Sequence, residues 1–253
     1  MTKYLFKNTL IEAIIVKRNS QFTLDVDIDG IVEKVHCPTT GRIGDIDLKN
    51  VACLISPSDN PNRKTKYTLE AVSVDNLDVE EKSWIGINQI ASNKYIEFFI
   101  SEGLFKDVVG DFESISREVK LGKSKLDLLV DNTYLEVKTP LQTLQVEYGS
   151  DIKRKKVTPF SSTDRFVKHM NELAGSLKDN ERAILLNTFQ YDNPGFKIIN
   201  KSTNYEEVSS TVKDCVEKGV EIWQVNMKID AEGVELIKVW DISEIFLDGS
   251  AWD

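Results

Sequence analysis

The sequence has few of the residues that build disulfide frameworks or zinc sites. Its 253 residues include only two histidines and three cysteines, which are far apart at positions 37, 53 and 215. An odd number of cysteines without a CxxC pair does not describe a disulfide framework, and it does not supply the ligands of a structural zinc site. We therefore expect the cysteines to be reduced and buried.

Long hydrophobic runs are also missing. No stretch approaches the roughly 18 apolar residues that indicate a membrane-spanning helix. The first residues, MTKYLFKNTL, have neither the apolar core of a secretory signal nor the Arg- and Ser-rich pattern of a transit peptide. We expect a cytoplasmic protein that has no membrane partner.

Positive charge is in deficit, with 32 Lys and Arg against 41 Asp and Glu and a formal net charge of −9. Nucleic-acid affinity depends largely on neutralising phosphates, so this balance argues against a general polyanion-binding surface. Two local basic clusters remain, RKTK at 63–66 and KRKK at 153–156. Each cluster alone is about equally consistent with solvated loop charges and with phosphate contacts.

Over its first ninety residues the sequence contains short segments typical of β-strands. The Asp29-Gly30 pair between two of them is a strong signal for a two-residue hairpin turn. Five or six short strands joined by Gly-, Pro- and Asn-rich turns predict a small closed barrel over residues 1–87. The expected strands are 11–17, 22–28, 31–37, 51–56, 67–74 and 84–88.

Beyond residue 88 the pattern changes to mixed helices and strands, which predict a second, α/β domain over 88–247. Residues 88–104 are helical, with Ile90, Tyr95, Phe98 and Phe99 on the apolar side. The run RAILLNTF at 182–189 is typical of a strand covered on both faces. Further helices are expected at 162–178 and around 208–216, further strands at 117–121, 126–130, 134–138 and 220–227, and a loose tail at 248–253.

The stretch SKLDLLVDNTYLEVKTP, at 124–140, is apolar except for a few charges in its middle. An ionised side chain that faces a core costs several kcal/mol unless it is paired, hydrated or bound to a metal. Glu136 and Lys138 share one face of their strand because side chains alternate along it. Asp127 lies opposite Glu136 on that face if the hairpin pairs Val130 with Thr133.

Two carboxylates in this position repel each other, and a divalent cation between them removes the repulsion. Oxygen ligands suit Mg²⁺ or Mn²⁺ rather than zinc. A metal held by two acids, with a lysine beside it, supplies the groups that phosphodiester cleavage uses. Glu97, on the preceding helix, is the candidate for a third acid and metal ligand.

The plain alternative is a Glu and Lys pair on an exposed sheet face. The motif alone favours this interpretation, because the chain is 29% charged and contains a second EVK at 118–120. The surrounding order of helix, three strands, helix and buried strand favours the metal site, since it is the order of the PD-(D/E)xK nuclease core.

A series of motifs then follows in a fixed order along the chain. They are RNSQF (18–22), HCPTTGR (36–42), SDNPNRKTKYTLE (58–70), IGIN (85–88), ASNKYIE (91–97), REVKLGKSKLD (117–127), YLEVKTP (134–140) and KHMNEL (168–173). Together they resemble the sugar fermentation stimulation protein A (SfsA) family over roughly residues 10–245. The resemblance implies an N-terminal OB-like β-barrel, a PD-(D/E)xK nuclease-like α/β domain with a mixed central sheet, DNA binding and a metal-dependent nuclease activity.

The resemblance places Asp127, Glu136 and Lys138 in the nuclease-like site, with Glu97 as the helix acid. It also retains four residues of a Thr-x-Arg-Gly-x-Lys-His pattern, namely Thr163, Arg165, Lys168 and His169. The Gly of that pattern is lost, and Thr39 stands where the family has Asn, so the substrate edge of the site departs from the family.

Eight residues are therefore candidates for nucleic-acid contacts. Four lie on or beside two barrel loops, and OB-like barrels bind strands through such loops. The other four begin the helix at 162–178, where a solvated face with ion pairs is the alternative for the basic residues and ordinary half-burial is the alternative for the histidine. The set is Arg42, Arg63, Lys64, Lys66, Thr163, Arg165, Lys168 and His169.

Two functions follow from these features. The first is a nucleic-acid-binding protein, acting on DNA or RNA with weak sequence preference, that hydrolyses phosphodiesters with Mg²⁺ or Mn²⁺. The second is a DNA-binding accessory or regulatory protein, linked to sugar metabolism, that keeps the nuclease fold without turnover. The intact acids favour the first, and the acidic net charge favours the second; either protein is compatible with a homo-oligomer.

Overall fold

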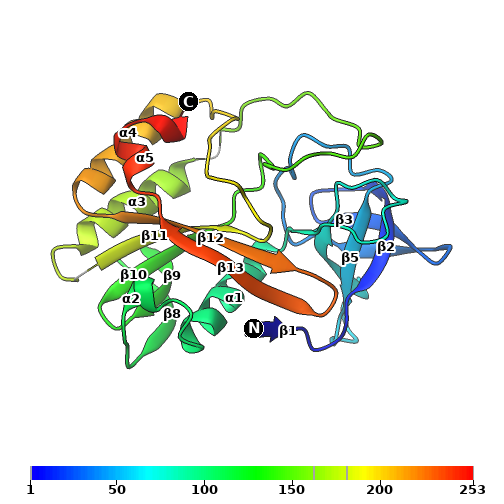
Figure 1. Cartoon of the computed structure of the whole chain (residues 1–253), viewed down its shortest axis with the longest axis horizontal. Coiled ribbons are helices and arrows are strands. Elements are labelled where there is room, and N and C mark those ends of the chain that lie inside the picture. The colour runs from blue at the N-terminus through cyan, green and yellow to red at the C-terminus, as the bar shows by residue number, and fades with distance from the viewer. Residues whose placement is uncertain (1, 162, 181, 253) are drawn as a thin grey trace.

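The computed structural model describes residues 2–161, 163–180 and 182–252 (Figure 1). Two lobes lie side by side, a small β-barrel and a larger domain built on a seven-stranded sheet. No helix of the described residues is long and apolar enough to cross a membrane. The three cysteines are buried and free, as expected.

The barrel is a closed ring of five strands. Antiparallel pairs join β4, β3, β2, β5 and β6 in that order, and a parallel pairing of β4 with β6 closes the ring. The short strand β7 (Ile85–Gly86) continues the sheet beyond β6. The ring consists of β2 (Ile11–Arg18), β3 (Thr23–Ile28), β4 (Ile31–His36), β5 (Ala52–Pro57) and β6 (Tyr67–Val72). The OB-like barrel is thus confirmed.

The predicted Asp29-Gly30 turn connects β3 to β4. Both residues have positive φ, 52° and 84°, as a tight hairpin turn requires. The Gly30 N–H donates to the Asp27 carboxylate at 2.7 Å and fixes the turn. Leu24 and Val26 alternate with polar neighbours and point into the barrel core, which sets the register of the ring.

The sheet of the second domain is mixed, as the sequence predicts. Its strand order is β1-β13-β12-β11-β10-β9-β8, and the central β10, β11 and β12 run parallel. The apolar strand β11 is buried along all but its first residue. The strands are β1 (Lys3–Leu5), β8 (Ile115–Leu121), β9 (Ser124–Val130), β10 (Thr133–Lys138), β11 (Arg182–Phe189), β12 (Glu221–Ile229) and β13 (Gly233–Asp241).

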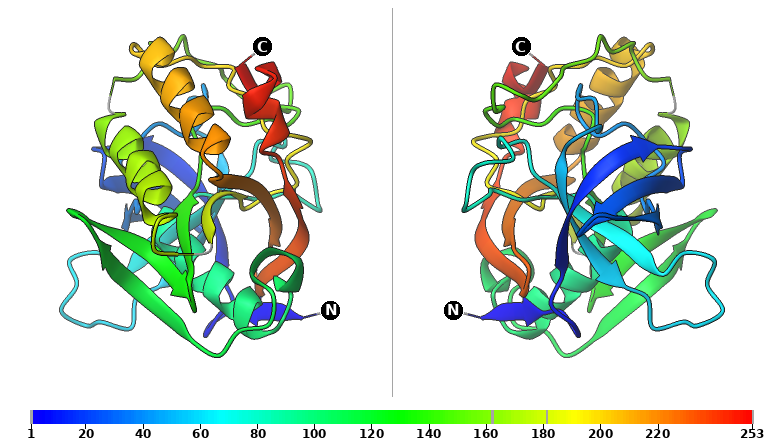
Figure 2. Two further views of the ribbon diagram at one scale, coloured as in Figure 1. Left: turned by 90° about the vertical axis from the view of Figure 1, so that its left-hand side faces the viewer. Right: turned by 90° about the vertical axis from the view of Figure 1, so that its right-hand side faces the viewer.

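Helices cover both faces of this sheet (Figure 2). One face packs against α1 (Gln89–Ser101), followed by the short α2 (Lys106–Val109). The other face packs against α3 (Asp164–Ser176), α4 (Tyr205–Glu217) and α5 (Glu244–Leu247). Parallel strands need this double cover because neither face of their apolar run is solvated.

One predicted helix face differs from the structure. Ile90 is 68% exposed, and the buried stripe of α1 begins at Ala91 and continues through Tyr95 and Phe99. The reason is helical spacing: Ala91, Tyr95 and Phe99 are four residues apart and share one face, whereas Ile90 lies about 100° around the helix from Ala91.

The domain boundaries predicted from the sequence also differ from those of the structure. Strand β1, expected in the barrel domain, pairs with β13 at the edge of the other sheet. The tail expected to be loose forms a 3₁₀ turn at Ser250–Trp252, whose Trp252 packs against Tyr205 and Phe246. Both corrections have one cause, which is that short terminal segments carry aromatic side chains that cover apolar surface of the sheet domain.

Candidate active site

The candidate site begins where β9 and β10 separate. Their antiparallel register pairs Val130 with Thr133, as predicted, and continues to Leu128 opposite Leu135. There the ladder stops, and the Asp127 carboxylate accepts a hydrogen bond from the N–H of Val137 at 2.9 Å. The side chain of Asp127 on β9 thus takes the place of a main-chain acceptor for the N–H of Val137 on β10.

The Glu136 side chain is buried on the α3 side of the sheet, and the residue is only 1% exposed. Its Oε1 atom lies 2.5 Å from Nδ1 of His169 and forms an ion pair with Nζ of Lys138. Its Oε2 atom is buried and has no hydrogen-bond partner among the described residues. Burying a carboxylate oxygen without a hydrogen-bond partner is unfavourable, so Oε2 of Glu136 can still accept a hydrogen bond or bind a cation.

Asp127 is held from the opposite side. Its Oδ1 atom accepts a hydrogen bond from Nδ2 of Asn93, on α1, at 2.8 Å. Burial raises the pKa of Asp127, and the charge of Glu136 raises it further, while the bond from Val137 and the charge of Lys138 act the other way. The two acids are therefore close enough to repel each other. The expectation that both carboxylates point from the same face of the sheet is wrong, because Asp127 turns toward β10 and α1.

Lys138 shares the face of Glu136, as the alternation along β10 predicts, and its side chain is partly exposed. The structure thus brings together three of the four predicted catalytic residues. A buried carboxylate, a second carboxylate with a raised pKa and a lysine that reaches solvent form a typical reactive set. We name Asp127 and Glu136 the acid pair.

Glu97 does not complete this set. It lies one turn after Asn93 on α1, and its carboxylate forms an ion pair with the guanidinium of Arg117 on β8. Within the residues that the structure describes, no three His, Cys, Asp or Glu side chains gather closely enough to hold a metal ion. The prediction of a three-acid metal site is therefore not met.

Two features of the site were missed in the sequence. Asn93, inside the motif ASNKYIE, holds Asp127. The signal available in the sequence was its position four residues before Glu97, which places it on the same face of the helix. A buried chain of hydroxyls also ties the end of β10 to its neighbours: Thr139 contacts Ser92 at 2.8 Å and Thr188 at 2.9 Å. Such a network fixes β10 against α1 and β11.

The start of α3 places the residues of the Thr-x-Arg pattern in different surroundings. Arg165 and Lys168 line a shallow hollow of about 410 Å³ together with His169. The ring of His169 is nevertheless buried against Glu136, so it is positioned to orient that acid rather than to lie on an open surface. Thr163 is also buried, and its hydroxyl contacts the Asn204 side chain at 2.8 Å.

The basic residues of the barrel fall into two groups. Arg63 bonds to Thr68 and Lys66 to Glu33, while Lys64 is exposed on the same loop. Arg42 lies in a hollow of about 590 Å³, the barrel hollow, and donates to the Thr158 carbonyl at 3.0 Å. The other four basic residues of the barrel hollow are Lys17, Arg18, Lys49 and Lys155.

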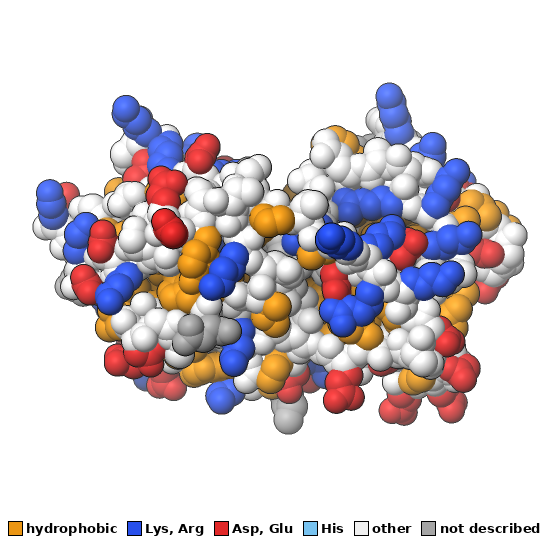
Figure 3. All heavy atoms as spheres, turned by 90° about the horizontal axis from the view of Figure 1, so that it is seen from above, with side chains coloured by type: hydrophobic (Ala, Val, Ile, Leu, Met, Phe, Trp, Pro, Cys, Tyr) orange, Lys and Arg blue, Asp and Glu red, His pale blue; other side chains and the backbone are white. Residues whose placement is uncertain are grey.

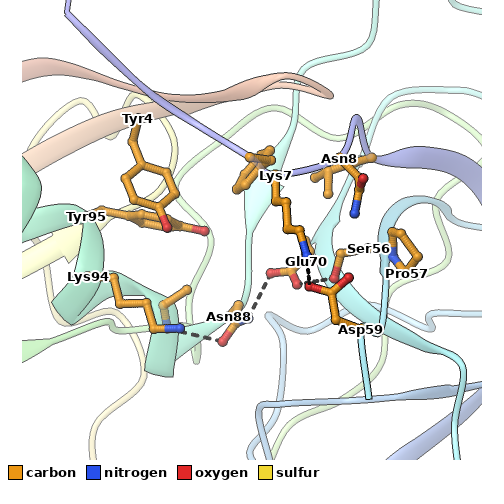
Figure 4. A pocket seen from close by; sticks show the side chains of 13 residues that line it. Tyr4, Lys7, Asn8, Ser56, Pro57, Asp59, Glu70, Asn88, Lys94 and Tyr95 are labelled. Carbon is orange, nitrogen blue, oxygen red and sulfur yellow. Dashed lines mark hydrogen bonds and ion pairs between the residues drawn. The ribbon is translucent and has the colours of Figure 1, made fainter. Parts of the chain in front are cut away.

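A further pocket of about 180 Å³ lies between the barrel and α1 (Figure 4). Its buried acid, Glu70, accepts hydrogen bonds from Ser56 at 2.6 Å and from Asn88 at 2.8 Å. Lys7 pairs with Asp59 at 2.8 Å at the rim. Because Glu70 is hydrogen-bonded and Lys7 is ion-paired within the protein, we interpret the pocket as a polar seam between the lobes rather than as the reactive site.

Comparison with known proteins agrees with this architecture. The family profile of the SfsA N-terminal OB domain matches residues 16–87, and that of the sugar fermentation stimulation protein RE domain matches residues 90–233. The sugar fermentation stimulation protein homolog of Maricaulis maris is 32% identical over 86% of this chain and 89% of its own length. The homolog of Trichodesmium erythraeum is also 32% identical, over 73% of this chain and 72% of its own.

A solved structure has the same fold. It is described as the structure of Pyrococcus furiosus SfsA in complex with Ca²⁺, and it matches with a TM-score of 0.70 over 94% of this chain and 98% of its own, at 20% identity. The family profiles cover both lobes and the acid pair. The chain belongs to the sugar fermentation stimulation protein (SfsA) family.

Proposed function

We propose that this protein binds nucleic acid and hydrolyses its phosphodiester bonds with Mg²⁺ or Mn²⁺ at Asp127, Glu136 and Lys138. One observation carries the proposal: the buried Oε2 atom of Glu136 has no partner among the described residues, and it belongs to an acid pair in which the pKa of Asp127 is raised. A hard divalent cation satisfies the free oxygen and removes the repulsion in one step.

The donors fit such a cation. Mg²⁺ is commonly bound by one or two carboxylates, with waters and substrate phosphates completing its shell, so the acid pair suffices without Glu97. The Pyrococcus furiosus SfsA structure is described as a complex with Ca²⁺, another oxygen-seeking ion, which supports a cation site in this fold. When bound, the metal supplies Lewis acidity toward a phosphoryl oxygen and a more acidic water.

The surrounding residues hold the acids in place. The Nδ1–H of His169 donates to the ionised carboxylate of Glu136, which can only accept, and so fixes its orientation. Asn93 and the N–H of Val137 do the same for Asp127. Lys138 presents a positive charge where a phosphoryl group gains negative charge during cleavage, and this stabilises the transition state.

Binding of the strand is assigned to the barrel hollow and to the start of α3. Two guanidinium nitrogens of Arg42, Nε and Nη2, are buried and have no partner among the described residues, and phosphate oxygens suit such donors. Lys and Arg side chains gather over the barrel lobe in Figure 3, despite the negative net charge of the chain. Arg165 and Lys168 add positive charge beside the acid pair.

The test is a cleavage assay with labelled single- and double-stranded DNA and RNA in Mn²⁺, in Mg²⁺ and in EDTA. We expect metal-dependent cutting by the wild-type protein, and a loss of at least about a hundredfold in Asp127→Asn and Glu136→Gln. Lys213→Ala, an exposed change on α4, is the matched control for preparation and should cut like wild type. Equal cutting by wild type and Asp127→Asn would remove the assignment.

A second function keeps the binding and omits the hydrolysis. It is favoured by the ion pair that holds Glu97 away from the acid pair, which leaves two acids where three were expected. A binding titration with the same labelled strands distinguishes the two functions: strand binding without cutting in Mg²⁺ or Mn²⁺ would support this DNA-binding accessory role.

A further inference from the structure

A second pocket adjoins the acid pair on the far side of Lys138. It encloses about 290 Å³, near the lower limit of the roughly 300–1,000 Å³ typical of ligand sites. It opens at the carboxyl ends of the parallel strands β10 and β11, where open α/β sheets commonly bind ligands. Four phenylalanines contribute to its walls: Phe160, Phe166, Phe189 and Phe196. We call it the Asn187 pocket.

Asn187 is the residue that points to a ligand. It interrupts the apolar run of β11, it is only 4% exposed, and its side chain lines the pocket. Its amide makes no hydrogen bond with any residue that the structure describes. Two other amides of the wall are bonded within the protein: Gln145 donates to the Gly195 carbonyl at 2.6 Å, and Asn200 donates to Thr143 at 2.7 Å.

The amide atoms of Asn187 are not among the fully buried, unpaired polar atoms of the described residues, so they are reached from the pocket and are free to hydrogen-bond a group that enters it. An amide offers one donor group and one acceptor group side by side, which matches the hydrogen-bonding edge of a nucleobase. The phenylalanine rings offer the apolar faces on which a planar base stacks. Lys138 pairs in register with Asn187 across β10 and β11 and so sets a positive charge next to this amide.

We propose that the Asn187 pocket receives one nucleobase, with the amide of Asn187 on its edge, a phenylalanine against its face and the adjoining phosphate at Lys138. This deepens the proposed function and rests on it for the source of the base, a nucleic-acid strand. A base lodged here fixes the position of the next phosphodiester relative to the acid pair. It also favours single-stranded or locally unpaired substrates, because the Watson–Crick edge of a paired base is occupied and its faces are stacked.

The experiment measures binding in the Asp127→Asn background with EDTA, so that cleavage does not interfere. A short labelled single strand is compared with a fully abasic strand of the same length, and we expect about tenfold tighter binding of the intact strand. Asn187→Leu keeps the number and branching of the side-chain heavy atoms but removes the amide, and it should abolish most of this difference. Asn171→Leu, at an exposed position on α3, is the matched control and should leave the difference between intact and abasic strands unchanged.

A second measurement uses the unaltered pocket. Nucleoside monophosphates should compete for the labelled strand at lower concentration than ribose 5-phosphate, which has no base. Equal competition by both, or equal binding of intact and abasic strands, would overturn the proposal. Tight binding of free monophosphates together with equal binding of intact and abasic strands would assign the pocket to a free nucleotide and overturn the strand as its source.

The two proposals fail separately. If wild type cuts nucleic acid in an Asp127-dependent way but binding does not depend on bases, the pocket assignment is wrong and hydrolysis stands. If binding depends on bases and on Asn187 but no metal supports cutting, the hydrolysis is wrong and the pocket stands.

Discussion

The carboxylate of Asp127 accepts a hydrogen bond from the backbone N–H of Val137 at 2.9 Å, just beyond the last paired residues of β9 and β10. This contact gives Asp127 a structural role in addition to its proposed chemical role. It satisfies the main chain of β10 at the point where the strands part, and it holds a negative charge near Glu136. Substitutions of Asp127 affect these two roles differently.

We expect Asp127→Asn to be more stable than wild type near neutral pH without metal. The amide oxygen still accepts from Val137, Asn93 can turn its amide to accept from the new NH₂ group, and the charge repelled by Glu136 is gone. Burial and Glu136 raise the folded-state pKa of Asp127, so its contribution to stability declines as the pH rises from the unfolded value, about 4, through the raised pKa. The advantage of the variant should therefore shrink on acidification.

Urea unfolding in EDTA over this pH range measures the effect. Asp127→Ala is the comparison: it removes the charge and also leaves the N–H of Val137 unpaired, which costs about 1–3 kcal/mol. A lower stability of Asp127→Asn than of wild type near neutral pH would show that the ionised form is favoured in the fold, contrary to the raised pKa.

His169 is expected to support metal binding without touching the metal. Its Nδ1 atom lies 2.5 Å from Glu136, so His169→Ala leaves this carboxylate with Lys138 alone. Removal of a partner that orients a metal ligand typically weakens metal affinity about 10–100-fold. His169→Asn carries an NH₂ group close to the position of Nδ1 and should recover part of the affinity.

Calorimetric titration with Mn²⁺, and the rise in melting temperature that Mn²⁺ causes, check this expectation. Asn171→Ala, on the exposed side of the same helix, is the control for helix stability. Unchanged Mn²⁺ affinity in His169→Ala would mean that Glu136 does not need this partner, or does not hold the ion.

Local patterns predicted the barrel strands, the hairpin register and the buried strand β11 because each depends on neighbours in the sequence. Alternation set the faces of Glu136 and Lys138, and the short turn between β9 and β10 set the pairing of Val130 with Thr133. The separation of the strands at Asp127 was not predictable in this way. It depends on a side chain that replaces a main-chain hydrogen bond.

Residues that depend on distant partners were placed less well. Glu97 looked like a metal ligand from its helix position, but its partner Arg117 comes from a strand that adopts positive φ, 49°, at Glu118. Strand β1 has three residues and pairs with β13, more than two hundred residues away. A segment of that length carries too little periodicity to be recognised alone.

Arg42 should make a measurable electrostatic contribution to strand binding. Two of its guanidinium nitrogens are buried in the barrel hollow without a partner among the described residues, so a bound phosphate gains their hydrogen bonds. We expect Arg42→Gln to weaken binding and to reduce the slope of log affinity against log salt by about 1. Anisotropy titrations over a salt series, with Lys213→Gln as the charge-matched control, test this; an unchanged slope would place the strand elsewhere.

The last residues of the chain should contribute strongly to stability. Trp252 is 8% exposed and packs edge-on against Tyr205 of α4 and Phe246 of α5, with ring centroids 5.6 and 5.7 Å apart. Truncating a buried Trp to Ala typically costs about 3–5 kcal/mol, because apolar contacts are lost and a cavity remains. We expect a loss in this range for Trp252→Ala and a smaller one for Trp252→Phe. Urea denaturation measures both, beside Ser250→Ala as an exposed control, and an Ala variant as stable as wild type would mean that the tail is loose in solution.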